Sequence, residues 1–125
     1  MPQVEASACE KPVLGINAMG MLDTMIHGET AFLADVAKKI VVDRVTLGGE
    51  SGFEEKHTVE FEVPRTVDYR ANVQDIAKYL LQLMNDAVLR EKMGKAGRER
   101  VVANFDYRVV AEKFVQLMHD KLGIK

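Results

Sequence analysis

The sequence predicts an α/β chain that is rich in helix, with two short parallel core strands and an inserted β-hairpin. Residues 12–16 (PVLGI) form a short apolar run without polar alternation, which is typical of a strand covered on both faces. Residues 40–63 contain two runs in which apolar and polar residues alternate, as in strands with one wet face. From residue 72 onward the apolar residues recur at helical spacing.

The first 34 residues are expected to build the core strands. Pro2 suits the first turn of a helix over residues 3–10, and Pro12 prevents the helix from continuing. After the strand at 12–16 we expect a loop at 17–20, one helical turn at 21–26, a tight turn at 27–30 and a second strand at 31–34 (AFLA). Cys9, among small residues and proline, is expected to be a buried thiol rather than a nucleophile.

The middle of the chain predicts the hairpin. Its strands carry apolar residues at even spacing, namely Val41, Val45 and Leu47, then Val59, Phe61 and Val63. The intervening GGESGFEE predicts a long, mobile tip. Pro64 is expected to end the second strand, because proline cannot donate to the ladder.

Three helices are expected to complete the chain. Asn72 (or Ala71), Asp86 and Asp106 stand where they can open these helices, and Gly123 stands where the last one ends. Gly94 and Gly97 weaken the second helix unless they permit close packing. The expected inner faces are Val73, Ile76, Ala77, Leu80, Leu81 and Met84; Leu89, Met93, Ala96 and Val101; and Val110, Phe114, Leu117 and Met118.

Composition excludes several classes of function. The 125 residues are 47% hydrophobic and 29% charged with a net charge of −2, which favours neither nucleic acid nor an anionic membrane as partner. No apolar run approaches the length of a membrane span, no signal peptide is recognisable, and the lone cysteine suits the cytoplasm. We expect no metal site, because His27 and His57 lack ligand partners at suitable spacing. The basic residues Lys92, Lys95, Arg98 and Arg100, interleaved with glutamates, are expected to form a solvated helix face.

Motifs in a fixed order carry a resemblance to a known family. VEASACEKPV is followed by Met19-Gly20, Leu22-Asp23 and the turn Gly28-Glu29-Thr30, and LLQLMNDAVLREKMGKAGRERVVANFDY follows later. Together they resemble the C-terminal domain of retaining GT-B glycosyltransferases of the group 1 type, in which two glutamates are separated by seven residues. The resemblance covers residues 1–34 and 72–122 and leaves 35–71 unmatched. The chain departs from the family pattern at Met19-Gly20 and Leu22-Asp23, where the family often has two glycines and then Pro-Glu.

The resemblance implies a fold and a donor site. The chain would be a single partial, Rossmann-like domain, with a donor-pocket remnant at 1–34, an insertion with the hairpin at 35–71 and C-terminal helices at 72–125. Glu5 would bind the ribose hydroxyls of a nucleotide-diphosphate sugar, and Gly20 and Asp23 would lie on the donor side. No cofactor, metal or catalytic residue is implied within this chain. The family's first glutamate would fall before Met1, so a further N-terminal domain is expected as partner, with donor affinity weak or lost.

Two hypotheses of function follow. In the first, the chain is a fragment of an enzyme that moves a sugar from its donor to an acceptor hydroxyl with retention, and it is inactive alone. In the second, it is a non-catalytic binding or self-assembly module on the same scaffold.

The strand at 12–16 is expected to have one bare edge, because only residues 31–34 remain as its partner. We therefore expect self-association through that edge, or its coverage by the hairpin.

Overall fold

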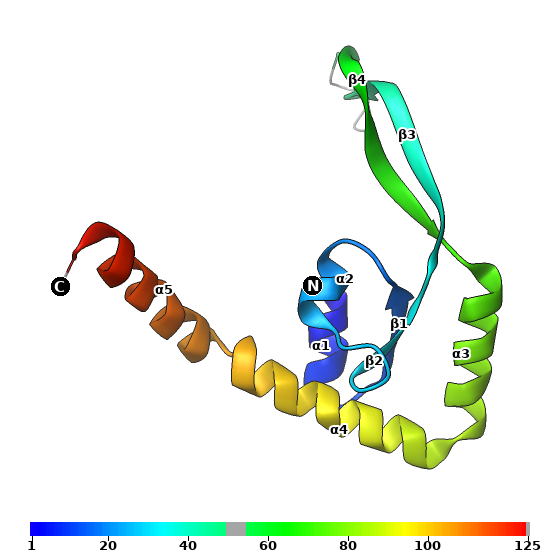
Figure 1. Cartoon of the computed structure of the whole chain (residues 1–125), viewed down its shortest axis with the longest axis vertical. Helices are drawn as coiled ribbons and strands as arrows, with labels where there is room; N and C mark the ends of the chain where they lie inside the picture. Colours follow the sequence, from blue (N-terminus) through cyan, green and yellow to red (C-terminus); the bar gives the residue numbers. More distant parts are fainter. Residues whose placement is uncertain (50–54, 125) are drawn as a thin grey trace.

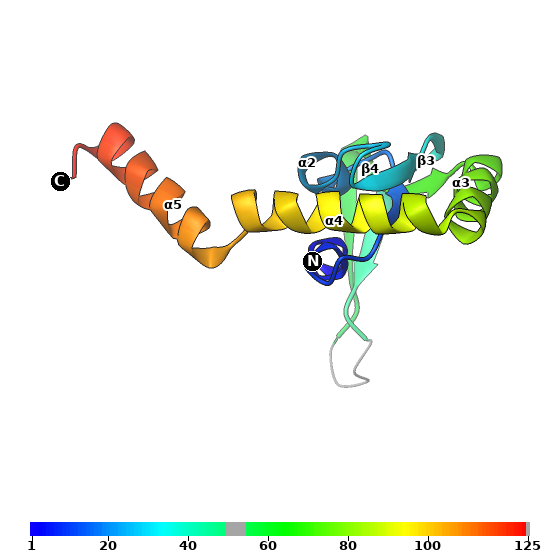
Figure 2. The same cartoon turned by 90° about the horizontal axis from the view of Figure 1, so that it is seen from below.

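The computed structural model describes residues 1–49 and 55–124, which form a small α/β body with two projecting parts. The elements, in chain order, are α1 (Pro2–Ala8), β1 (Val13–Ile16), α2 (Gly20–Thr24), β2 (Ala31–Ala34), β3 (Val36–Leu47), β4 (His57–Ala71), α3 (Val73–Asn85), α4 (Ala87–Asn104) and α5 (Tyr107–Leu122). The β3–β4 hairpin extends from one end of the body and α5 from another (Figures 1 and 2). The predicted α/β class is confirmed.

The centre of the body is a parallel pair of strands. β1 and β2 pair in register from Val13 with Ala31 to Ile16 with Ala34, as the apolar sequences of both strands predict. Alternate residues of β2 point to opposite faces. Ala31 and Leu33 join Met25 in one cluster, packed against Val4, Val13 and Met21 of the α1 and α2 side.

The other face of this sheet packs against α3 and α4. Phe32 forms a cluster there with Leu83 and Met93, and its ring stacks on that of Tyr79 at 4.7 Å between centroids. Both faces of the short sheet are therefore covered, as an unbroken apolar strand requires. The expected inner face of α4 is confirmed, with Met93 buried and Leu89 half-buried.

The face expected for α3 is wrong, and the face expected for α5 packs on nothing among the described residues. In α3 the buried side chain is Leu83, whereas Val73, Leu80, Leu81 and Met84 are exposed. The apolar side of this helix is broad, and the packing onto Phe32 uses only the part of it near Leu83. α5 has no buried residue at all. Its spacing is helical as expected, but it extends beyond the body (Figure 2).

The helix ends follow the sequence closely. The Asn72 side chain accepts from the backbone N–H groups of Gln74 and Asp75, Asp86 accepts from Leu89 N, and Asp106 accepts from Arg108 N. Gly123 ends α5 in the left-handed conformation, at φ 62°. These caps are confirmed because each one depends only on neighbours within four residues.

The hairpin is longer than predicted, and Pro64 does not end its second strand. β4 continues to Ala71, and the pairing shifts between Val42, opposite Arg65, and Arg44, opposite Glu60. Pro64 falls within this irregularity, where the ladder does not require its missing N–H. The expected single wet face is also wrong, since Val41, Leu47, Val59, Val63 and Val67 are all exposed. The predicted mobile tip falls largely on residues 50–54, outside the described residues.

The hairpin does not cover the free edge of β1. β3 and β4 form a sheet of their own, separate from β1 and β2. Among the described residues, β1 has only β2 as a strand partner. The expectation that the hairpin would cover this edge is therefore wrong, whereas self-association remains a prediction. The expected burial of Cys9 is wrong as well, because the thiol is exposed just beyond α1.

Candidate functional site

The three predicted donor-side residues lie on two helices that flank the first core strand. Glu5 belongs to α1, which precedes β1, and Gly20 and Asp23 belong to α2, which follows its carboxyl end. A hydrogen bond of 3.5 Å from the Gln3 Nε2 to the Thr24 hydroxyl joins the two helices. In open α/β sheets, ligands bind at the carboxyl ends of the strands, so the position of α2 suits a ligand site.

Glu5 presents its carboxylate to solvent. Its side chain is 78% exposed, and Oε1 lies 3.6 Å from the amino group of Met1. An exposed pair of this kind holds the side chain weakly. The carboxylate is thus accessible to hydroxyl donors, but the described residues do not enclose it. A groove of about 470 Å³ runs nearby along β1, and its lining residues are Pro2, Gln3, Ala6, Pro12, Val13, Leu14, Gly15, Ile16 and Met21.

The loop that carries Gly20 has an unusual backbone. Met19 has φ 55° and ψ −145°, a conformation that almost only glycine adopts without strain. A Cβ at Gly20 itself would meet no atom within 4 Å. The position whose backbone demands glycine is therefore Met19, where the resembling family often has the first of two glycines. Asp23 is exposed in the single turn of α2 that follows.

Arg100 ties this loop to α4, a role that the sequence did not reveal. Its Nε donates to the carbonyl of Thr24 at 2.9 Å, and Nη2 donates to that of Asp23 at 3.2 Å. A guanidinium at the carboxyl end of a helix satisfies carbonyls that lack partners and complements the helix dipole. No local sequence signal identifies this contact, because Arg100 lies 76 and 77 residues from its two partners.

Arg98 does the same for α1, donating to the Ala8 carbonyl and lying 3.8 Å from the Glu10 carboxylate. The expected solvated basic face is wrong only for Arg100, which is half-buried, whereas Arg98 is exposed as expected even though it makes these contacts. The expectation also fits Lys95, whose Nζ lies 2.7 Å from Glu91 Oε1 on the exposed surface. The hydrogen bond and charge of Lys95 lower the pKa of Glu91.

A polar network closes the carboxyl end of the two core strands. Asn17 Nδ2 donates to Asp35 Oδ1 at 3.3 Å, and Asp35 N donates to Asp75 Oδ2 at 3.0 Å. Asn72 N donates to the Asp35 carbonyl at 2.8 Å. These contacts join the ends of both strands to the start of α3, at the point where the hairpin leaves the body. They were not predicted, because the partners are up to 40 residues apart.

His27 lies in the predicted tight turn and has a structural role. Its Nδ1 accepts from the backbone N–H of Leu33 at 2.9 Å, and its ring packs on Tyr79 and Phe32. Gly28, at φ 79°, lets the turn close with a hydrogen bond to the Ala31 carbonyl. The turn thus protects the outer edge of β2, while the outer edge of β1 has no comparable cover among the described residues.

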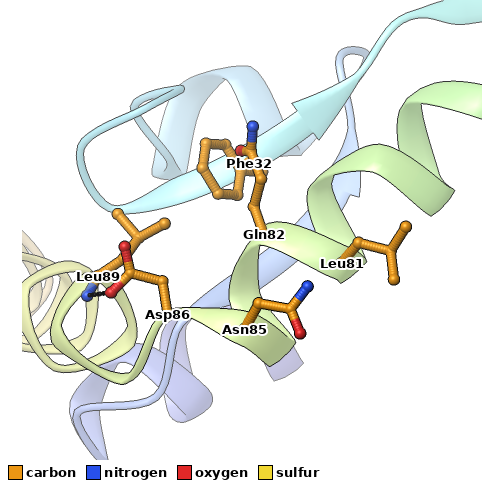
Figure 3. Close-up of a pocket in the computed structure, with 6 residues that line it drawn as sticks. All are labelled: Phe32, Leu81, Gln82, Asn85, Asp86 and Leu89. Atoms are coloured by element: carbon orange, nitrogen blue, oxygen red, sulfur yellow. Dashed lines mark hydrogen bonds between the residues drawn. The ribbon is translucent and has the colours of Figure 1, made fainter.

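Another hollow, of about 600 Å³, lies between β2, α3 and α4 (Figure 3). Its lining residues are Phe32, Leu81, Gln82, Asn85, Asp86 and Leu89. The Asp86 carboxylate is already engaged by the amide of Leu89. Because α3 starts beside the carboxyl end of β2 and packs along it, this hollow lies toward the opposite end of the strands. Neither Glu5 nor the α2 loop contributes to it.

Comparison with known proteins gives one informative match. The chain is 30% identical over 110 residues to a capsular polysaccharide biosynthesis glycosyltransferase, CapM, from Staphylococcus aureus. The match covers 88% of this chain but 20% of that protein, so the chain spans about a fifth of the relative's length. No family model and no solved structure matches. In the part of the chain that the structure describes, no helix has the length and apolar character to cross a membrane. The sequence of this chain is therefore similar to one segment of a glycosyltransferase.

Proposed function

We propose that this chain is part of a retaining GT-B glycosyltransferase, and that the complete protein transfers a sugar from a nucleotide-diphosphate donor to an acceptor hydroxyl. The observation that carries the proposal is the similarity to a glycosyltransferase over 88% of the chain. It is supported by the parallel strands, whose carboxyl end leads directly into the α2 loop. In this proposal the chain is cytoplasmic, which suits its single, exposed and unpaired thiol.

In this proposal Glu5 is a ribose-binding residue. An ionised carboxylate accepts hydrogen bonds from two vicinal hydroxyls at once, and charge-assisted bonds of this kind are stronger than neutral ones. Its high exposure leaves both oxygens accessible. The α2 loop would approach the donor through its backbone, beside Gly20, with Asp23 at the donor side.

The chain alone is proposed to lack catalysis. Sugar transfer requires the donor and acceptor to be held in one geometry, and stabilisation of the departing diphosphate. The described side chains near Glu5 form an open surface rather than an enclosed site, and no cation lies among the lining residues of the adjacent groove. Any donor binding by this chain should therefore be weak and should not lead to transfer.

The test is an NMR titration of the purified chain with uridine, guanosine and adenosine diphosphates. We expect shifts in the amides of α1 and residues 17–24, and their loss in Glu5→Ala. Glu29→Ala is the matched control, because it removes an equal charge from the exposed turn at the other end of β2. Absence of shifts with every nucleotide would refute donor recognition by this chain. Transfer from a nucleotide sugar by the chain alone would refute its proposed inactivity.

A non-catalytic self-assembly module is the second candidate. The open edge of β1 and the apolar groove along it favour this function, since a bare strand edge is a template for pairing. Substitution of Ile16 by lysine would place a charge at that edge. Loss of self-association in Ile16→Lys, without nucleotide binding by the unaltered chain, would favour the module over the enzyme fragment.

A further inference from the structure

The last helix carries an exposed apolar stripe that the proposed function does not use. We define the α5 stripe as Tyr107, Val110, Phe114, Leu117, Met118 and Leu122, each of which lies three or four residues from another member. Phe114 is 61% exposed and Leu117 is 52% exposed. The helix extends away from the rest of the chain, so none of its residues is buried (Figures 1 and 2).

The total surface of the chain is larger than that of a compact monomer of its mass. The accessible surface is 9386 Å². A compact monomer of 14.0 kDa exposes about 6,700 Å². The excess is about 2,700 Å², against roughly 800 Å² that each partner buries in a standard interface. The excess exceeds the area that one partner buries in a standard interface, and α5, which has no buried residue, is one of the exposed elements.

We propose that α5 pairs with α5 of a second copy as an antiparallel two-helix coiled coil. Placed in a heptad repeat, Tyr107, Phe114 and Lys121 occupy one core position, and Val110 and Leu117 occupy the other. Antiparallel pairing then sets Phe114 of one copy against Leu117 of the other, and Val110 against the aliphatic part of Lys121. Each contact occurs twice, because the two copies are related by a two-fold axis.

A hollow on the helix surface fits this arrangement. About 320 Å³ of space lies over Phe114, Leu117, Met118, Lys121 and Leu122. Its first four members are the residues that would surround Phe114 of the second copy in the antiparallel register. A side chain inserted among four residues of the facing helix is the packing unit of coiled coils.

Charge selects the antiparallel direction. The same register places Lys113 of each copy beside Asp120 of the other, at the positions that flank the core. Neither side chain belongs to an ion pair among the described residues, although Asp120 accepts a hydrogen bond from Gln116. A parallel pair would instead set Lys121 against Lys121 within the core, which is unfavourable for like charges. The inference does not depend on sugar transfer or donor binding.

The test is sedimentation equilibrium of the full chain from about 1 μM to about 1 mM, the range expected for a small interface. We expect a reversible dimer. Phe114→Gln and Leu117→Gln should each raise its dissociation constant about tenfold or more. Val115→Gln is the matched control, because Val115 is also 52% exposed but points about 100° away from Phe114 around the helix.

Charge exchange tests the direction of pairing. Lys113→Asp and Asp120→Lys should each weaken the dimer about threefold, and the double variant should restore it, because each copy then supplies the complementary charge. A parallel pair would show no such restoration. Circular dichroism shows whether each variant remains folded.

A chain that stays monomeric over the whole range would overturn the proposal and leave the stripe to another part of a longer protein. A dimer that persists in Leu117→Gln but is lost in Ile16→Lys would also overturn the proposal, since that dimer would form through the β1 edge.

Discussion

Substitution of three glycines by alanine tests the packing of α1 against α4. A Cβ at Gly94 would overlap the backbone carbonyl of Glu10, just beyond α1. A Cβ at Gly97 would lie 3.1 Å from Ser7 Oγ and 3.2 Å from Ser7 Cβ. At Gly20 it would meet nothing within 4 Å. The three positions therefore form a series of decreasing crowding.

The expected stabilities follow from two opposing terms. Alanine is favoured over glycine within a helix by about 1 kcal/mol. Overpacking costs typically about 1–3 kcal/mol. Because the overlap at Gly94 is with backbone atoms that cannot retreat, we expect the upper end, so Gly94→Ala should lower the free energy of unfolding by up to about 2 kcal/mol after the helix gain is subtracted. In Gly97→Ala the two terms should nearly cancel. Gly20→Ala should be neutral or stabilising by up to about 1 kcal/mol.

Urea denaturation followed by circular dichroism measures the series. For slopes of about 1–2 kcal/mol per molar urea, Gly94→Ala should lower the unfolding midpoint by about 1 M. The slopes should not change, since the same surface becomes exposed. Equal midpoints for Gly94→Ala and the unaltered chain would refute the close approach of α1 to α4. A large loss in Gly20→Ala would show instead that glycine is required in the α2 loop.

Two further predictions concern the α2 loop. Met19→Gly should raise the free energy of unfolding by about 1 kcal/mol, because the relief of a strained φ exceeds the extra backbone entropy that glycine loses on folding. Urea denaturation measures this gain. Met19→Ala, which keeps the Cβ, is the control and should show no such gain. Arg100→Met should speed hydrogen exchange at the backbone N–H of Met25, which donates to the Met21 carbonyl. It should also lower the free energy of unfolding of the chain by about 1–2 kcal/mol, because two charged hydrogen bonds are lost. Arg108→Met, on exposed α5, is its control, and equal exchange in both variants would contradict the anchoring role.

The local elements of this protein could be predicted from its sequence. The two core strands, the turn at 27–30 and the caps at Asn72, Asp86, Asp106 and Gly123 all lie where the sequence predicts them. Each is decided by hydrogen bonds or steric preferences among residues a few positions apart. The similarity to a glycosyltransferase could likewise be predicted, because it depends on the order of motifs along the sequence. The roles of Glu5, Gly20 and Asp23 stay predictions.

Contacts between distant residues could be decided only by the tertiary structure. Apolar spacing alone did not identify Leu83 as the buried residue of α3, because the face that packs depends on where Phe32 lies. From the sequence, Arg100 was expected to lie on a solvated helix face. The fold instead places it beside two carbonyl groups that lie 76 and 77 residues away in the chain. The exposure of α5 follows the same reasoning. Its sequence determined an amphipathic helix, but whether that apolar face is covered depends on what the rest of the fold places next to it.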